Sequence, residues 1–178
     1  MFCYIRIVYK YCIPCSYYFT KQLAGKQLYE KTLEVLKNIE ECGFEVIRLV
    51  ADNAKINLSM FKLFGNGTLL PSIPHPCDSH RKIFLSFDPN HIIKNVRSLF
   101  LENNMTDGKE LISGQFLKLL YALQKDDNIK AVRNLTIKHI EPTNFEKMNV
   151  GRAVLIFSPP VTAALEFLHE NSQRHPKA

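Results

Sequence analysis

The sequence contains no tryptophan and no stretch of eighteen consecutive apolar residues, so it offers no transmembrane helix. Its first ten residues are mostly apolar, but Arg6 and Lys10 interrupt the core that a signal peptide requires. We therefore expect a chain that stays inside the cell and has no membrane partner. In that setting its five cysteines are expected to be reduced thiols rather than a disulfide framework.

Two nucleotide- and metal-binding patterns are also missing or incomplete. Gly65-Asn66-Gly67 marks the exit of a helix and is not a glycine-rich loop ending in Lys-Ser/Thr, so there is no P-loop. Cys12 and Cys15 have the spacing of half a zinc site, but the second half would have to come from a tight loop at 75–80. A redox Cys-x-x-Cys pair begins a helix, whereas this pair lies between predicted strands. Zinc is therefore the weaker hypothesis.

What the sequence does contain describes an ordinary globular protein of one domain, or one domain and part of another. It has 178 residues, 46% of them hydrophobic, with twelve Phe and seven Tyr to build a core. The formal charge of +6 favours an acidic partner such as nucleic acid. The excess falls in residues 81–138, with ten basic against six acidic side chains, although a solvated helical face would produce the same pattern.

The first ninety residues mix strands with helices. Short β-branched and aromatic runs predict strands, and apolar residues at helical spacing predict helices. A first strand at the chain's start would leave an edge that recruits a partner strand. The expected elements are strands 2–10 and 15–20 joined at Pro14, a helix 26–42 stopped by Gly43, a strand 44–51, a short helix carrying Leu58, Phe61 and Phe64, a three-proline loop 68–81, and a strand 82–87.

The remainder is predicted to be helical. The expected helices are 90–103, one capped by Ser113 that carries residues 116–123, one opened by the capping box Thr143–Glu146 and running to about 157, and a last one after Pro159-Pro160 that runs to about 170. The fold class is therefore α/β, with a mixed sheet to about residue 90 followed by an α-helical part.

Two strand-to-helix junctions open on an acidic residue. Asp52 ends the third strand, with Asn57 one turn into the next helix, and Asp88 ends the last strand before Pro89. Carboxylates held at strand ends suit Mg²⁺, which takes oxygen ligands and keeps several waters. The alternative is that each aspartate caps the helix that follows it. His91 lies four residues from Asn95, on the same helical face, where a hydrogen-bonded role is favoured over a metal ligand.

At these junctions the chain resembles a family, the P-element-type transposases, which include the THAP-domain-containing transposases. The resemblance spans roughly residues 4–170, and its most specific part is Asp-Pro-x-His-hydrophobic-x-Lys-Asn-x-Arg. The matching segments are 50–57, His75-Pro76, 87–97, 135–140 and 145–150. The implied architecture is a partial, truncated RNase H-like core over residues 1–90 and an incomplete GTP-binding-type insertion over 91–178.

The resemblance also implies roles for particular residues. Asp52 would be a catalytic carboxylate and a ligand of Mg²⁺, while Lys94 and Arg97 would face the DNA backbone. Asn57, Asp88, His91 and Asn95 would be structural residues of the strand-to-helix motif. The nucleotide phosphates would be bound by four cations, Lys130, Arg133, Lys138 and Arg152. By the same resemblance the protein would be nuclear, and its partners would be the DNA of transposon ends or a full-length transposase.

Several departures from the family pattern bear on activity. The strand with the first catalytic Asp, the distant Glu and the zinc-coordinating DNA-binding domain have no match. Asn134 and Asn149 stand where the family often has cations, which would weaken phosphate contacts by about 1.5–3 kcal/mol each.

The expectation is a transposase fragment, ancestrally competent for metal-dependent DNA cleavage and strand transfer, and inactive as an isolated chain. The alternative is a domesticated module that binds nucleic acid, nucleotide or protein without catalysis. A third hypothesis is a fragment without a stable fold of its own.

Overall fold

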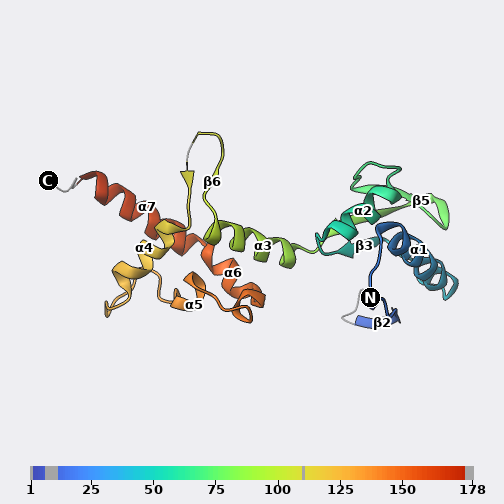
Figure 1. The fold of residues 1–178 in the computed structure, drawn as a ribbon, viewed down its shortest axis with the longest axis horizontal. Coiled ribbons are helices and arrows are strands. Elements are labelled where there is room, and N and C mark those ends of the chain that lie inside the picture. Colours follow the sequence, from blue (N-terminus) through green and yellow to red (C-terminus); the bar gives the residue numbers. More distant parts are fainter. Residues whose placement is uncertain (1, 7–11, 110, 175–178) are drawn as a thin grey trace. The chain divides into compact units, whose positions relative to one another are not determined.

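The computed structural model describes residues 2–6, 12–109 and 111–174. The chain divides into two compact units, Met1–Asp88 and Pro89–Ala178 (Figure 1). The first unit holds two small sheets and two helices, and the second is mainly helical. The predicted α/β class, a mixed sheet followed by a helical part, is confirmed.

The first unit begins with an antiparallel pair of strands, β1 (Phe2–Arg6) and β2 (Cys12–Tyr17). Residues 7–10 of the strand expected at 2–10 lie outside the described residues. Pro14 was expected to turn the chain, and this is wrong, because Pro14 lies within β2 opposite Tyr4. A two-stranded ribbon tolerates proline, since each strand has one edge where no ladder hydrogen bond is needed.

The main sheet has three strands in the order β3-β5-β4: β3 (Arg48–Ala51), β4 (Ser72–His75) and β5 (Asp78–Phe87). β3 runs parallel to β5, whereas β4 and β5 form an antiparallel hairpin. The loop expected at 68–81 is therefore mostly wrong. Pro74 is tolerated because β4 is an edge strand, where proline removes no central ladder bond.

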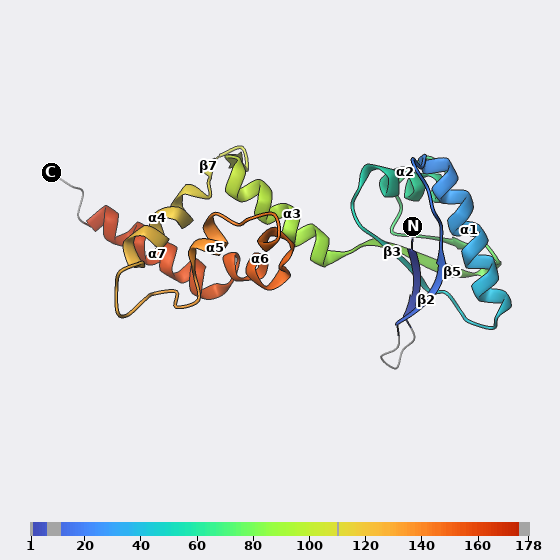
Figure 2. The same ribbon diagram turned by 60° about the horizontal axis from the view of Figure 1, so that its bottom comes forward.

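Two helices cover one face of this sheet, α1 (Gly25–Glu41) and α2 (Lys55–Phe64) (Figure 2). Gly43 adopts a φ of 86° and ends α1 as predicted, because its N–H and that of Phe44 satisfy the last free carbonyls. The core between helices and sheet consists of Leu28, Leu36, Met60, Phe61, Phe64, Ile73, Ile83 and Leu85.

The opposite face of the three-stranded sheet carries apolar residues that are exposed to solvent. Strand side chains alternate between faces, so Ile83 and Leu85 enter the core while Phe84 between them points away. Phe84 is 49% exposed, and Val50 on the neighbouring β3 is 58% exposed. The first unit thus presents a partly apolar sheet surface that none of its own described elements buries.

The second unit begins with α3 (Pro89–Glu102), followed by a short hairpin of β6 (Met105–Thr106) and β7 (Leu111–Ile112). The sequence did not predict this hairpin, because two-residue strands carry no periodicity. The remaining elements are α4 (Gln115–Gln124), α5 (Ile137–Ile140), the 3₁₀ turn η1 (Glu146–Met148), α6 (Val150–Ile156) and α7 (Pro159–Arg174).

A second core joins these helices, built from Leu117, Leu120, Val132, Leu135, Ile140, Ile156, Val161 and Ala164. The long connection after α4 is fixed by one buried side chain, Gln124. Its amide Nε2 donates to the carbonyl of Val132 at 3.0 Å, and its Oε1 accepts from the Val132 N–H at 2.9 Å. Two backbone groups are thereby satisfied inside the core.

The predicted capping box forms, but it opens a shorter element than expected. The Thr143 N–H donates to a Glu146 carboxylate oxygen at 2.9 Å, and the turn that follows is η1, not an α-helix. Asn149 then caps α6 by accepting from the N–H of Arg152 at 2.9 Å. Pro159 begins α7, because the first helical position needs no N–H donor.

One segment qualifies the expectation that no helix is suited to a membrane. Among the described residues, Val150–Asn171 is long and apolar enough by length and composition to span one. In the structure it is two helices separated at Phe157 and Ser158. Residues of both helices contribute to the core of the second unit.

Candidate functional site

The parallel pairing of β3 with β5 brings two acidic residues to one edge of the sheet. Ala51 and Phe87 are register partners at the carboxyl ends of the two strands, so Asp52 and Asp88 follow at the same edge. The N–H of Asp88 donates to the carbonyl of Ala51 at 2.8 Å, which extends the ladder by one bond. The two junctions that the sequence singled out are thus neighbours.

Asp52 closes a turn just before α2, whose N-cap residue is Ala54. Its Oδ1 accepts from the N–H of Ala54 at 2.9 Å and from Nδ2 of Asn57 at 2.8 Å. Asn57 therefore fixes the carboxylate from the first turn of α2, as its position suggested. The alternative that Asp52 caps α2 is wrong, because the N-cap residue is Ala54 and no side chain accepts a capping hydrogen bond there. Binding of Mg²⁺ by Asp52 stays a prediction.

The residues at this edge fit a magnesium ion in part. Within the described ranges, no three His, Cys, Asp or Glu side chains lie close enough together to hold a metal. Mg²⁺ commonly binds through one or two carboxylates and completes its shell with waters and substrate phosphates. Asp52 and Asp88 supply two carboxylates at most, so phosphate oxygens and waters would have to provide the other ligands. The same finding leaves the weaker zinc hypothesis without a ligand group in the described part.

A second polar cluster lies at the His75-Pro76 turn, and the sequence did not predict it. Glu40, near the end of α1, binds the β4–β5 hairpin through an ion pair with Arg81. His75 is 3% exposed, and its Nε2 lies 3.2 Å from Oε1 of Glu40, although the geometry does not make a hydrogen bond. Its Nδ1 accepts from the N–H of Cys77 at 3.1 Å. His75 of the His-Pro pair thus has a structural role, because it lies against Glu40 of α1 and accepts a hydrogen bond within the turn.

Glu40 also holds the chain that enters β3. Its Oε1 accepts from the N–H of Val46 at 2.6 Å. Burial raises the pKa of Glu40, but the Val46 N–H, the Arg81 guanidinium and the nearby His75 outweigh burial and lower it overall. One carboxylate therefore ties together α1, the approach to β3 and the β4–β5 hairpin. The spacing of charges in the sequence gives no signal for this, since the contacts are far apart in the chain.

In the second unit, His91 and Asn95 meet as expected. Asn95 Nδ2 lies 3.5 Å from Nδ1 of His91, one turn apart on α3. Asn95 and Lys94 are both partly exposed on this helix. The proposal of a DNA contact by Lys94 is compatible with that position.

The expectation that Arg97 faces DNA needs correction. Arg97 is 1% exposed, and its Nη2 donates to the carbonyl of Lys147 at 2.8 Å. It therefore ties α3 to η1 from inside the unit. A cation on α3 was expected to face solvent, but Arg97 is the residue of this helix that is buried, and its guanidinium finds a backbone carbonyl there.

Two of the four cations assigned to nucleotide phosphates come together around one carboxylate. Lys138 Nζ lies 3.7 Å and Arg152 Nη1 lies 3.6 Å from Oε1 of Glu146. The Thr143 N–H and hydroxyl, with these two cations, lower the pKa of Glu146 against the opposing effect of partial burial. Glu146 thus occupies the position where an anionic ligand would meet both cations.

The other two cations are placed differently. Lys130 Nζ donates to the carbonyl of Lys125 at 2.8 Å and so closes the loop after α4. Arg133 is exposed on the same connection. Among the described residues, the cations that form ion pairs with Glu146 are Lys138 and Arg152, and neither Lys130 nor Arg133 joins them. Of the four predicted phosphate ligands, Lys138 and Arg152 form a cluster.

Comparisons with known proteins point in the same direction for both units. Residues 1–65 match a family described as the TNP-like RNase H N-terminal domain, and residues 90–177 match the TNP-like GTP-binding insertion domain. The Transposable element P transposase of Drosophila melanogaster is 26% identical over 132 residues, covering 74% of this chain and 17% of that protein.

A solved structure supports the fold. The Drosophila P element transposase strand transfer complex contains a chain that is similar with a TM-score of 0.75 and 20% identity, over 90% of this chain and 35% of the other. The fold is thus an RNase H-like α/β domain followed by a helical insertion. More specifically, the matched segments of the two units are similar to the TNP-like RNase H N-terminal domain, to the TNP-like GTP-binding insertion domain and to the Drosophila P transposase.

The Glu40 cluster predicts a specific acid sensitivity of the first unit. Because the folded-state pKa of Glu40 is lowered, its stabilisation is present above the ordinary carboxyl value and is lost as pH falls through the folded-state pKa. Glu40→Gln should lower the free energy of unfolding at pH 7 by about 1–3 kcal/mol and flatten its decline in acid.

Glu41→Gln is the matched control, because Glu41 is the exposed neighbour of Glu40 on α1. Urea unfolding between pH 3 and 7 would measure both variants. If the free energy of unfolding depended on pH equally in Glu40→Gln and in the unmodified chain, Glu40 would not be the residue that stabilises the contacts among α1, the approach to β3 and the β4–β5 hairpin.

Proposed function

We propose that this chain is a segment of a P-element-like DNA transposase that binds DNA or a full-length transposase and does not cut DNA by itself. The ancestral reaction would be metal-dependent DNA cleavage and strand transfer. The chain spans 17% of the length of the curated relative and 35% of the length of the solved chain that it resembles. Both of those proteins therefore contain much more chain than the parts compared. Membership of the THAP-domain-containing group and a nuclear location are parts of the same proposal.

The observation that carries the proposal is the carboxylate edge formed by Asp52 and Asp88. Phosphodiester displacement of this type uses two metal ions about 3.5–4 Å apart, which stabilise the attacking and leaving oxygens. Such a pair needs more carboxylates than one strand end supplies. Among the described residues no group of three potential ligands exists. In the proposal, the remaining ligands of the pair of ions would come from another segment or a partner.

In the proposal Asp52 keeps one role from the ancestral site. It would hold a single Mg²⁺, with Asn57 fixing the carboxylate through the hydrogen bond described above. The metal would supply positive charge against phosphate oxygens. Lys94 would contact the DNA backbone from α3, and Asp88, His91 and Asn95 would hold the second strand-to-helix junction in shape.

Binding of a transposase partner is the second candidate function, and one surface favours it. Val50 and Phe84 leave an apolar patch on the outer face of the sheet, and β3 pairs through only one of its edges in the described residues. An exposed edge strand next to apolar side chains is a template for another strand. A full-length homologue could supply that strand.

The proposal also includes binding of a nucleotide by the second unit. GTP phosphates would contact Lys138 and Arg152, with Lys130 and Arg133 as further cations of the same unit. The residues fit this role incompletely, because both clustered cations already face Glu146. An arriving phosphate would have to displace that carboxylate.

A nicking assay tests the central part of the proposal. Purified chain incubated with supercoiled plasmid and Mg²⁺ or Mn²⁺ should leave the plasmid intact, because one carboxylate edge does not hold two ions. Nicking that is abolished by Asp52→Ala but kept by an Asp126→Ala control would show an active enzyme and contradict the proposal. Asp126 is suited as a control because its side chain is exposed in the second unit.

The phosphate role of the Glu146 cluster has its own test. Fluorescent GTP analogue should bind Arg152→Gln more weakly than the unmodified chain, by about tenfold for one lost charge-assisted contact. Glu146→Gln should bind more tightly, since it releases both cations. Lys125→Gln, far from this cluster in sequence and exposed, should change nothing. Unchanged affinity in both Arg152→Gln and Glu146→Gln would place any nucleotide elsewhere.

A further inference from the structure

His139, on α5, is a buried histidine to which the proposed function assigns no role. Its side chain is 8% exposed. Leu135 and Ile140, which flank its turn on both sides, belong to the core of the second unit. Side chains of α4 and α6 contribute to the same core. The segment 135–140 is therefore anchored in the core at both of its ends.

The ring of His139 is bonded to the first residue of that turn through Nδ1. This nitrogen accepts from the N–H of Thr136 at 3.2 Å and lies 2.9 Å from the Thr136 hydroxyl. The N–H of His139 in turn donates to the carbonyl of Thr136 at 2.9 Å. An imidazole nitrogen accepts a hydrogen bond only while it carries no proton. The turn seen here therefore requires the neutral ring, with its proton on Nε2.

Protonation of the ring would change the role of Nδ1 from acceptor to donor. It could still bond the hydroxyl of Thr136, but the backbone N–H of Thr136 would lose its acceptor. The new positive charge would also lie inside the core, where burial disfavours the charged form of a histidine. Both changes favour an opened segment, in which water solvates the ring and the free N–H.

The charged groups that act on His139 come from the elements packed around it. Burial lowers the pKa of His139, the cation Arg152 on α6 lowers it further, and Glu146 of η1 acts the other way without outweighing them. Glu146 is itself paired with Lys138, the residue before His139 on α5. From α4, the ionisable Tyr121 packs against the same core.

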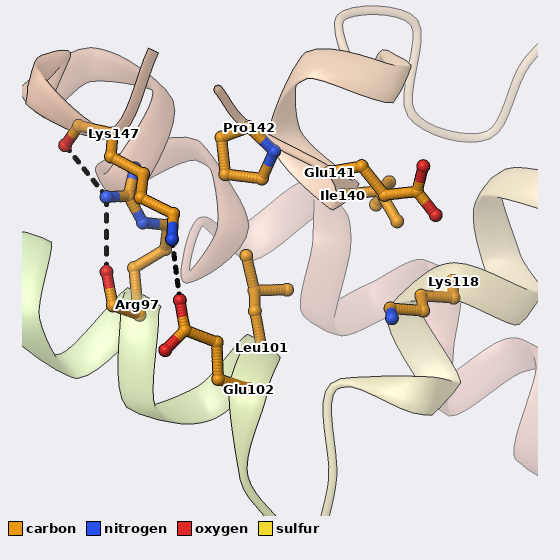
Figure 3. Close-up of a pocket in the computed structure, with 9 residues that line it drawn as sticks. Arg97, Leu101, Glu102, Lys118, Ile140, Glu141, Pro142 and Lys147 are labelled. Carbon is orange, nitrogen blue, oxygen red and sulfur yellow. Dashed lines mark hydrogen bonds and ion pairs between the residues drawn. The ribbon is translucent and has the colours of Figure 1, made fainter. Parts of the chain in front are cut away.

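The residues after His139 border a cavity that brings further charged groups close to α5. Ile140 and Glu141 line this cavity together with Arg97 of α3 and Lys118 of α4 (Figure 3). Movement of α5 would therefore also change the wall of the cavity and the place of Glu141.

We propose that His139 is a pH switch of the second unit, whose neutral ring holds the segment 135–140 in the core and whose protonation opens this segment. Lys138 lies within the segment, and its ammonium is 3.7 Å from Oε1 of Glu146. Opening would part these two groups, so acid would rearrange the Glu146 cluster together with the turn. The switch does not rest on the proposed function, because it needs no ligand.

Hydrogen exchange of the intact chain between pH 5 and 7.5 tests the switch. Because the pKa of His139 is lower in the folded unit than its ordinary value of 6.5, the stabilisation is present above that value and declines as pH falls toward the folded-state pKa. Protection factors of the amides at 139–141 should fall by up to about tenfold per pH unit, the limit for one proton. His139→Gln has no ring to titrate and should make this protection independent of pH.

His169→Gln is the matched control, because His169 is an exposed histidine on α7 of the same unit. It should leave the pH dependence at 139–141 unchanged. Protection that does not vary with pH in the unmodified chain, or that varies equally in His139→Gln, would overturn the proposal.

A second measurement decides the matter if His139→Gln does not fold. The Cε1–H signal of His139 should titrate at a lower pH in the folded, unmodified chain than in the same chain unfolded in urea. Titration at the same pH in both states would also overturn the proposal.

Discussion

The parallel pairing of β3 with β5 is the constraint on which the first unit depends. A parallel pair needs a long crossover between its strands, and here that crossover contains α2 and the β4 strand. The pairing sends Ile83 and Leu85 into the core and places Asp52 and Asp88 at one edge. A shift of register by one residue would reverse the faces of the strand and separate the two carboxyl junctions.

Glu40 helps to stabilise the pairing of β3 with β5 from the other side of the first unit. β3 is short, and its free energy of pairing is small compared with the cost of ordering the loop before it. The bonds from Glu40 to Val46 and Arg81 fix the chain where it enters β3 and the hairpin that contains β5. In the second unit, Gln124 and Arg97 do the same for connections without regular structure. Polar side chains with little exposure, hydrogen-bonded to backbone groups, thus hold connecting segments in both units.

The periodicity of apolar residues in the sequence was sufficient to predict the long helices, but it did not predict several of the short helices and strands. α1 and α3 were predicted to within one residue at each end, because their apolar residues repeat at helical spacing and Gly43 ends the first of them. α2 was predicted from its apolar residues and its exit at Gly65. The strand 82–87 was predicted and forms the second half of β5. β4 and the start of β5 were assigned to a loop because Pro74 and Pro76 suggest irregular chain, whereas an edge strand accepts proline. The capping box at Thr143 was predicted, but the length of what it opens depends on packing that no local pattern contains.

The candidate site was predicted unevenly for the same reason. Asp52, Asn57 and the His91–Asn95 pair lie within one or two turns of each other in sequence, and their contacts follow from local geometry. Arg97 was expected on the surface because charged residues usually lie there, yet its partner is a carbonyl fifty residues away. Glu40 was missed because its partners come together only through the tertiary fold. Glu146 was predicted as a capping residue, but its ion pairs with Lys138 and Arg152 were not.

Paramagnetic Mn²⁺ offers the most direct test of the carboxylate edge. Titrated into the chain at low concentration, it should broaden the amide signals just after β3 and β5 first. Asp52→Asn keeps an oxygen for the Ala54 N–H and removes the charge, so it should abolish this broadening while the fold is retained. Broadening that persists in Asp52→Asn, or that is centred on another part of the chain, would contradict the account and leave Asp52 with the structural role of bonding Ala54 and Asn57.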